Sequence, residues 1–174
     1  MPGSFHPPIR GKAADKNQGV SQSLASNTAA DTATVATLLK NKGGNVISIN
    51  PEDTIAAAVK VLGEHGIGAL PVVTATGELS GILSERDIVR KLAQTSGETL
   101  PQSVAENMTP GVETCTADES LVSVLRRMTD GRFRHMPVVS DGRVCGMVTI
   151  GDVVNFRLRE LEHEALQLKQ MIVG

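Results

Sequence analysis

A chain of 174 residues, of which 40% are hydrophobic and 21% charged, is long enough for one ordinary domain or for two small domains packed together. Its net charge of −2 and its lack of Trp and Tyr argue against nucleic-acid binding, which uses a basic face or aromatic stacking platforms. The N-terminus has no hydrophobic signal segment, and no hydrophobic run reaches the roughly 18 residues of a membrane span. We therefore expect a cytoplasmic protein with an aliphatic core.

The first 30 residues are rich in Pro, Gly, Ser, Asn and Ala and show no hydrophobic periodicity. This composition predicts a disordered tail over residues 1–30. Asp31 is a candidate N-cap for a short helix that carries Val35 and Leu38, and the glycines at 43–44 predict its end. Order is therefore expected to begin near residue 31.

Two long segments of the chain resemble each other. VISINPEDTIAAAVKVLGEHGIGALPVV, which starts at Val46, aligns with VETCTADESLVSVLRRMTDGRFRHMPVV, which starts at Val112. GELSGILSERDIV, from Gly77, then aligns with GRVCGMVTIGDVV, from Gly142, after a turn that is one residue shorter. Such a duplication predicts two copies of one structural unit.

Both copies predict the element order β-α-β-β-α. A capping pair at 53–54 or 119–120 precedes hydrophobic residues at the i, i+3, i+4, i+7 spacing of one helix face, and Gly66 or Gly131 is expected to end that helix. Hydrophobic runs with glycine turns follow and predict hairpins. The predicted strands are 46–49, 69–73 and 79–83 in the first copy and 112–115, 135–139 and 144–148 in the second.

The hairpin turns are expected at Gly77 and Gly142, and a second helix is expected after Ser84 or Thr149. One copy alone is too small to bury both faces of its sheet, so the two copies are expected to fold together. The predicted fold class is therefore α/β (α+β), with the two copies packed as one unit.

Several motifs recur in register in both copies. These are acidic residues and a Thr or Ser leading into a helix (after Pro51 in the first copy and Ala117 in the second), a Leu-Pro-Val-Val or Met-Pro-Val-Val strand, and Gly-x-x-Ser/Thr-x-x-Asp. Together they resemble the cystathionine-β-synthase (CBS) domain, here as a tandem pair of the kind called a Bateman module, over about residues 42–155. The resemblance implies a first repeat with its N-terminal helix over 31–95, a second repeat over 103–156, and a C-terminal amphipathic helix over 157–174.

The Gly-x-x-Ser/Thr-x-x-Asp motif places a hydroxyl at the end of a strand and a carboxylate in the first turn of the next helix. The pairs are Ser84 with Asp87 and Thr149 with Asp152. A carboxylate there is favoured by the helix dipole and can accept hydrogen bonds from both hydroxyls of a ribose, the role that the resemblance implies. The same pattern is also a capping box that satisfies only the N–H groups of its own helix.

The residues just before the Pro-Val-Val strand differ between the copies. The second copy has Arg134 and His135, whereas the first has Gly68 and Ala69. The resemblance implies that this segment meets the α-phosphate of a nucleotide, so Arg134 and His135 are the expected phosphate ligands. Gly68 and Ala69 would let the backbone approach a phosphate closely.

Each of these cationic residues also has an ordinary structural interpretation. Arg132 and Arg134 fit a solvated basic loop, and His135 fits a strand histidine without a ligand. Lys42 and Arg86 are further candidates for phosphate binding and fit an exposed surface equally well.

Sites in the CBS family combine residues from both repeats, which predicts two pseudo-symmetric sites. The first would use Thr149, Asp152, Arg134, His135 and Met147 with Ile47 and Ile67. The second would use Ser84, Asp87, Gly68 and Ala69 with Met108 and Phe133. Because the cationic residues fall in the first site, we expect it to bind a phosphorylated ligand more tightly.

The resemblance implies a non-catalytic regulatory module that binds an adenine nucleotide. AMP fits a cleft with few cations best, NAD(H), ADP and ATP remain open, and the cations disfavour S-adenosylmethionine. The alternatives are an interaction scaffold with a vestigial cleft and an enzyme that uses His135 with Asp152 or Ser84. The enzyme lacks support because no G-x-S-x-G motif, metal-binding pattern or phosphate-binding loop is present.

Two further expectations concern the cysteines and the C-terminus. Cys115 and Cys145 lack the spacing of a metal site, and we interpret both as small core residues. From Val153 onward, hydrophobic residues recur at spacings of three and four, which predicts a helix that packs on the CBS core or on a second subunit. CBS pairs commonly form homodimers, and the resemblance implies one here.

Overall fold

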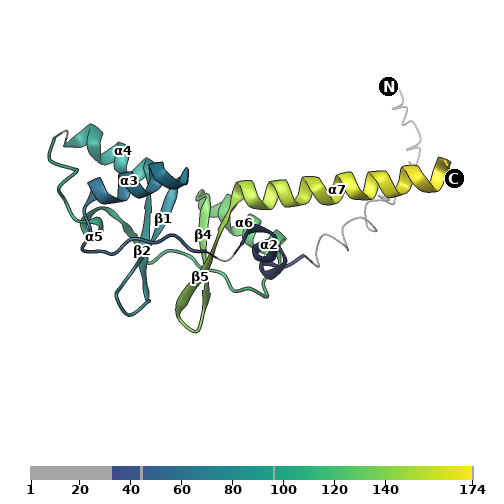
Figure 1. Cartoon of the computed structure of the whole chain (residues 1–174), viewed down its shortest axis with the longest axis horizontal. Helices are drawn as coiled ribbons and strands as arrows, with labels where there is room; N and C mark the ends of the chain where they lie inside the picture. Colours follow the sequence, from purple (N-terminus) through teal and green to yellow (C-terminus); the bar gives the residue numbers. More distant parts are fainter. Residues whose placement is uncertain (1–32, 44, 96, 174) are drawn as a thin grey trace, which may run out of the picture.

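The structure, a computed structural model, describes residues 33–43, 45–95 and 97–173. It holds two units side by side along the long axis of the molecule, and one long helix extends away from them (Figure 1). The predicted tail over 1–30 and the candidate cap Asp31 lie outside the described residues. The fold is a mixed α+β arrangement of two repeated units, as the sequence predicts.

The two units share one order of elements. The first contains α3 (Ile55–His65), β1 (Ala69–Val73), β2 (Leu79–Ser84) and α4 (Glu85–Gln94), and the second contains α6 (Leu121–Gly131), β4 (His135–Ser140), β5 (Arg143–Thr149) and α7 (Ile150–Val173). A short segment precedes each unit: α2 (Val35–Lys42) comes before the first, and α5 (Val104–Asn107) with β3 (Thr109–Pro110) comes before the second.

Each unit is built on an antiparallel hairpin, β1 with β2 and β4 with β5, and β3 pairs with the other edge of β2. The segments 46–49 and 112–115, which were predicted to be strands, each form only a single parallel bridge. These bridges join Ile49 to Val72 and Cys115 to Val138. Ile49 donates its N–H to Pro71 and accepts from Val73, which is one rung of a ladder. The chain then turns at residue 50, so the ladder cannot continue.

Turns and helix starts follow the chemistry that the sequence predicts. Asp141 and Gly142 both have a positive φ, 50° and 76°, as a two-residue type I′ hairpin turn requires. The Thr54 side chain accepts from the N–H of residue 57, and the Ser120 side chain accepts from the N–H of residue 123, so both predicted capping pairs contain the N-cap.

The helix ends differ between the units. Gly66 ends α3 in the left-handed conformation, as predicted, but α6 runs through Gly131 and ends one residue later than predicted. Arg132 therefore takes the left-handed conformation, with a φ of 56°. Gly131 also leaves room for Phe133, because a Cβ at position 131 would collide with the ring where it now lies.

Each hydrophobic core is completed by the segment that precedes the other repeat. Val35 and Leu38 of α2 are buried in the core of the second unit, and Val104 of α5 is buried in the core of the first. Backbone hydrogen bonds fix both exchanges, from the N–H of Val35 to Glu119 at 2.9 Å and from the N–H of Val104 to residue 53 at 2.8 Å. The range 31–95 thus contains a helix that packs on the second repeat.

Two more features differ from expectation. Cys115 is buried, whereas Cys145 is exposed, because alternation along β5 turns Gly146 and Val148 toward the core and Cys145 away from it. The helix α7 is continuous through the domain boundary expected at residue 156, because no helix-breaking residue lies there. The predicted C-terminal helix is therefore the second helix of the second repeat, lengthened.

We predict that Arg132→Gly stabilises the protein by about 1 kcal/mol, because glycine adopts the left-handed conformation without the steric cost of a side chain. Urea unfolding of the full chain measures the difference. The matched control is Gly66→Ala, at the equivalent position of α3 with a φ of 60° and open space around it, which should lose about as much. A less stable Arg132→Gly variant would mean that the arginine side chain makes a contact worth more than the strain.

Candidate functional site

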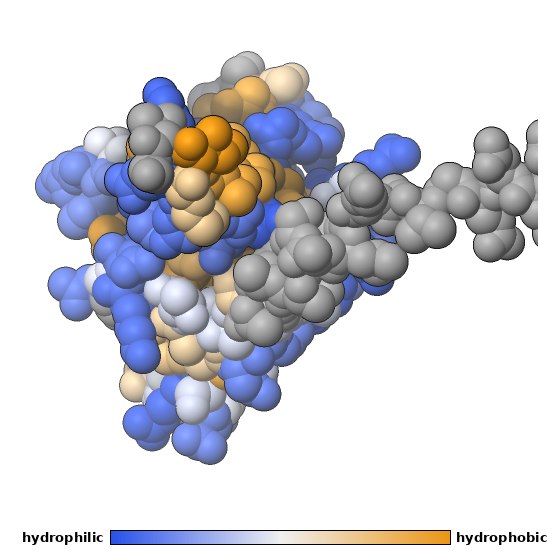
Figure 2. Space-filling model, turned by 90° about the vertical axis from the view of Figure 1, so that its right-hand side faces the viewer, coloured by the Kyte–Doolittle hydropathy of each residue, from blue (hydrophilic) through white to orange (hydrophobic). Residues whose placement is uncertain are grey.

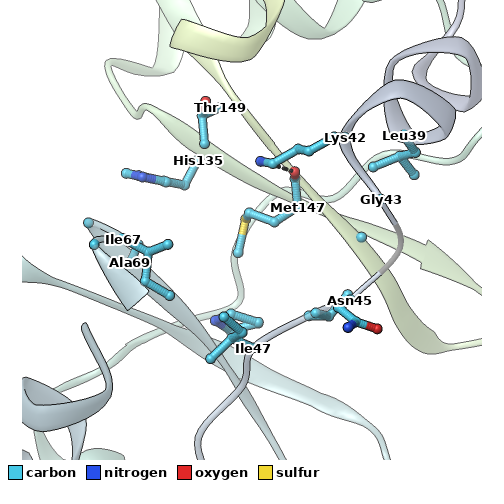
Figure 3. Close-up of a pocket in the computed structure, with 15 residues that line it drawn as sticks. Leu39, Lys42, Gly43, Asn45, Ile47, Ile67, Ala69, His135, Met147 and Thr149 are labelled. Atoms are coloured by element: carbon cyan, nitrogen blue, oxygen red, sulfur yellow. Dashed lines mark hydrogen bonds between the residues drawn. The ribbon is translucent and has the colours of Figure 1, made fainter. Parts of the chain in front are cut away.

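A cavity of about 250 Å³ lies where the two repeats meet (Figure 3). The first repeat and the segment before it contribute Asn45, Val46, Ile47, Gly66, Ile67, Gly68, Ala69 and Pro71. The second repeat contributes His135, Gly146, Met147 and Thr149, and the end of α2 contributes Leu39, Lys42 and Gly43. Three parts of the chain that are distant in sequence therefore form one site.

The second repeat supplies the polar wall of the cavity. His135 on β4 is paired directly with Thr149 on β5, so the two side chains are cross-strand neighbours on one face. Met147 pairs with Pro137 one step further along the same face. The alternating residues of these strands, such as Val138, point to the core instead.

The first repeat supplies a mostly hydrophobic wall. Ile47, Ile67 and Ala69 face His135 and Met147 across the cavity (Figure 3). Ala69 occupies the position that corresponds to His135, so only one of the two walls carries an imidazole. A Cβ added to Gly68 would lie 3.6 Å from Nε2 of His135, which shows how closely the first repeat approaches the histidine.

Lys42, which lines the cavity, forms an ion pair with Asp152, which is not itself one of the lining residues. The Nζ of Lys42 lies 2.6 Å from Oδ2 of Asp152, and it also donates to the carbonyl oxygen of Met147 at 3.2 Å. The lysine comes from α2 and the carboxylate from the first turn of α7. The pair therefore connects the segment before the first repeat to the second repeat.

Asp152 also forms the capping box that the sequence analysis kept as an alternative. Its Oδ2 accepts from the N–H of Thr149 at 3.0 Å, and the hydroxyl of Thr149 accepts from the N–H of Asp152 at 3.0 Å. Within the described residues, every hydrogen bond to this carboxylate reaches Oδ2. Capping therefore leaves Oδ1 able to accept further hydrogen bonds.

The charges of the site are set by burial and by neighbouring groups. Burial opposes ionisation of Asp152, but hydrogen bonds from Lys42 and Thr149 outweigh it and lower the pKa of this carboxyl. Burial lowers the pKa of His135, and the positive charge of Lys42 lowers it further. At neutral pH the site thus holds an anionic aspartate and a neutral histidine.

The residues predicted for the second site are not gathered in the same way. Asp87 forms a capping box with Ser84, Met108 packs on the core of the first unit, and Phe133 packs on the core of the second. Gly68 and Ala69, which were assigned to that second site, line the cavity described above. Arg86 and Arg134 are exposed.

Sequence reasoning missed several residues that line the cavity. Leu39 lies on α2, Asn45 lies in the link from α2 to the first repeat, and Gly146 lies on β5. Leu39 and Gly146 meet closely, because a Cβ on Gly146 would lie 2.8 Å from a methyl group of Leu39. No local pattern signals this contact, because it depends on α2 crossing to the second repeat.

The described residues contain neither a membrane-spanning helix nor a cluster of metal-binding side chains. Within them, no helix combines the length and hydrophobicity needed to cross a membrane. The described residues also bring together no group of three or more His, Cys, Asp or Glu side chains that could hold a metal ion.

Comparison with known proteins identifies the family. The model of the CBS domain matches residues 39–94 and 103–159, and the chain belongs to the CBS-domain family. The mitochondrial CBS domain-containing protein CBSX3 of Arabidopsis thaliana is 35% identical over 153 residues, which cover 83% of this chain and 74% of the relative.

Solved structures agree with this assignment. A CBS-domain containing protein from Agrobacterium tumefaciens is 40% identical, with a TM-score of 0.69 over 72% of this chain and 94% of that chain. The CBS domain pair of protein MJ0100, solved with 5′-methylthioadenosine and S-adenosyl-L-methionine, is 30% identical, with a TM-score of 0.64 over 74% of this chain and 98% of that chain. CBSX2, solved with AMP, is 26% identical, with a TM-score of 0.61 over 73% of this chain and 97% of that chain.

We predict that His135 titrates below the pKa of 6.5 of an ordinary histidine, and that Lys42→Met moves its pKa upward by removing a neighbouring positive charge. Titration of the imidazole signals by NMR measures both effects. Asp152→Asn should move the pKa in the opposite direction, because the carboxylate favours the charged imidazole. An unchanged pKa in the Lys42→Met variant would mean that the lysine lies too far from the histidine in solution to affect it.

Proposed function

We propose that the cavity binds an adenine nucleotide, with AMP the best fit, and that the protein is a non-catalytic regulatory module. The observation that carries this proposal is a hydroxyl and a neutral histidine beside a hydrophobic wall, in a cavity that both repeats line, together with an ionised carboxylate that pairs with Lys42 of the lining. These groups suit the three parts of a nucleotide: ribose, phosphate and base.

The ribose is assigned to Asp152 and Thr149. A carboxylate in the first turn of a helix can accept from both hydroxyls of a vicinal diol, and the helix dipole of α7 favours its negative charge. The open Oδ1 can accept one hydroxyl, and Oδ2 can accept the other once Lys42 leaves it. Capping and ribose binding are therefore compatible uses of the same carboxylate.

Lys42 has a different part in the free and bound states. In the free protein its ammonium group neutralises Asp152, which removes the cost of an unpaired, partly buried carboxylate. A ribose diol would replace the lysine at the carboxylate and release its ammonium group toward the phosphate. The lysine then exchanges the carboxylate for the phosphate, and the carboxylate exchanges the lysine for two hydroxyl donors.

The phosphate is assigned to Lys42 and His135, with Arg134 at the rim. His135 is neutral in the free cavity because burial and Lys42 lower its pKa. A phosphate beside the imidazole favours the protonated form, so binding takes up protons as the pKa rises. The charges of Lys42 and Arg134 lower the pKa of His135 in the free protein, and those of Asp152 and Glu85 raise it.

The adenine is assigned to the hydrophobic wall, between Ile47, Ile67 and Met147. Two solved CBS-pair structures support an adenosine group, since one holds AMP and the other holds 5′-methylthioadenosine and S-adenosyl-L-methionine. Those ligands share adenosine and differ in what is attached to it. The cationic Lys42 and the histidine favour AMP, or the AMP half of NAD(H), ADP or ATP, over a sulfonium ligand.

Regulation would follow from where the cavity lies. A ligand held by both repeats and by α2 stabilises the one arrangement in which all three meet, and this shifts the population of conformers or partners. The competing function is an interaction scaffold whose cleft binds nothing. Ligand binding to the native state must raise the unfolding temperature, whereas a scaffold shows no shift with any adenine nucleotide.

We predict that Asp152→Asn weakens AMP binding at least ten-fold, because a charge-assisted hydrogen bond contributes about 1.5–3 kcal/mol. Isothermal titration calorimetry measures the dissociation constant. The matched control is Asp87→Asn, at the same position of the first repeat, which should leave this cavity unaffected. AMP that lacks the 2′- and 3′-hydroxyls should bind wild type and Asp152→Asn alike, and a retained difference would remove the ribose assignment.

We predict that Lys42→Met weakens AMP binding about ten-fold but leaves adenosine binding unchanged or slightly stronger. The phosphate loses its cation, whereas the ribose no longer competes with a lysine for Asp152. Lys40→Met, an exposed change on the same helix, is the control. Equal losses for AMP and adenosine would show that the lysine only shapes the cavity.

A further inference from the structure

The outer part of α7 carries hydrophobic residues that the described chain does not cover. We call them the α7 stripe: Val154, Leu158, Leu161, Ala165, Leu168 and Ile172. Their spacings alternate between four and three residues, which are the d and a positions of a heptad. The large members of the α7 stripe are between 43% and 83% exposed.

The α7 stripe is not the face with which the helix packs on its own domain. Val153 is buried in the core of the second unit and Phe156 packs against that core, so these residues mark the inward face. At 100° per residue, the α7 stripe lies on the neighbouring face, about 100° around the helix from Val153. Figure 1 shows α7 reaching well beyond the other elements of the fold.

The far end of α7 also exposes hydrophobic surface. Figure 2, which views the molecule from the side toward which α7 extends, shows hydrophobic residues gathered there and bordered by hydrophilic ones. Met171 and Ile172 are 72% and 83% exposed. A patch of this kind on a helix marks an interaction surface, because isolated exposed leucines are common but continuous rows are not.

The charges beside the α7 stripe discriminate between partners. Arg157 and Glu164 occupy g positions, and Glu162 and Lys169 occupy e positions. In a parallel pair of helices, each g residue meets the e residue five positions later in the partner. Arg157 then meets the partner's Glu162, and Glu164 meets the partner's Lys169. Both contacts are attractive, and two-fold symmetry makes each occur twice.

The antiparallel arrangement is disfavoured by the same residues. In the register that overlaps the whole α7 stripe, e residues meet e residues and g residues meet g residues. Glu162 then meets the partner's Glu162, and Glu164 meets the partner's Glu164. Like charges in such positions are repulsive, so the sequence selects the parallel orientation.

We infer that the α7 stripe binds the α7 stripe of a second copy of this chain, as a parallel two-stranded coiled coil over residues 154–172. Arg157 lies 3.3 Å from Glu160 in the single chain, so its guanidinium shares that contact or exchanges it on pairing. The competing occupant is residues 1–32 of the same chain, which contain no heptad pattern.

Disulfide trapping tests the contact directly. In a Cys145→Ser background, which removes the exposed native thiol, Leu168→Cys places two thiols opposite each other only in the parallel pair. We expect it to form a disulfide-linked dimer at least about ten-fold faster than Gln170→Cys, which lies on the outer side of the helix, because pairing raises the effective concentration of the thiols. Non-reducing gels follow the reaction. Equal rates would overturn the proposal, whether the protein is monomeric, antiparallel or dimeric through another face.

Charge reversal tests the orientation in the full chain. Glu164→Lys should raise the dimer dissociation constant about five-fold or more, because two attractive contacts become repulsive. Adding Lys169→Glu restores opposite charges and should return the constant to within about two-fold of wild type. Sedimentation equilibrium measures all three proteins, with thermal unfolding to show that each is folded. An unchanged constant in Glu164→Lys, or a wild type that dimerises only after residues 1–30 are removed, would overturn the proposal.

Discussion

The structure depends on an exchange of segments between the repeats. The α2 helix precedes the first repeat but buries Val35 and Leu38 in the core of the second, and Val104 is buried in the core of the first. Burial of hydrophobic surface contributes about 25 cal/mol per Å² to the free energy of folding. Each core therefore gains stability from the segment that precedes the other repeat. The exchange also explains the cavity, because it carries Lys42 from the end of α2 to the second repeat, where the lysine meets Asp152.

The proposed function uses an asymmetry that arose within the duplication. Both repeats keep a hydroxyl and a carboxylate at the start of a helix, and in both the pair forms a capping box. Only the second carboxylate has a lysine and a histidine beside it, since Ala69 stands where the second repeat has His135. A capping box needs neither a lysine nor a histidine, so helix stability alone does not explain why both stand beside Asp152.

Features encoded by short-range patterns could be predicted from the sequence. The hairpin strands, the capping pairs and the type I′ turn at Asp141 are local, and the sequence places them within one residue. A stop at Gly131 was expected because glycine is the usual residue at a helix end, but α6 includes Gly131, which leaves room there for the Phe133 ring. The path of α2 could not be predicted, since nothing in its composition says which repeat it joins. The sequence marks Lys42 as a candidate phosphate ligand. Its contact with Asp152 could not be predicted, because that contact depends on the path of α2.

Both proposals meet in α7. Thr149 directly precedes it, its first turn holds Asp152, and the α7 stripe occupies the rest of a helix of 24 residues, about 36 Å long. A continuous helix transmits a rotation of its first turn to its far end, because its backbone hydrogen bonds leave little freedom between them. If a ribose replaces Lys42 at Asp152 and α7 turns with it, then ligand binding and helix pairing become linked. Linkage is reciprocal, so pairing would change the affinity for nucleotide by the same factor as nucleotide changes the affinity for pairing.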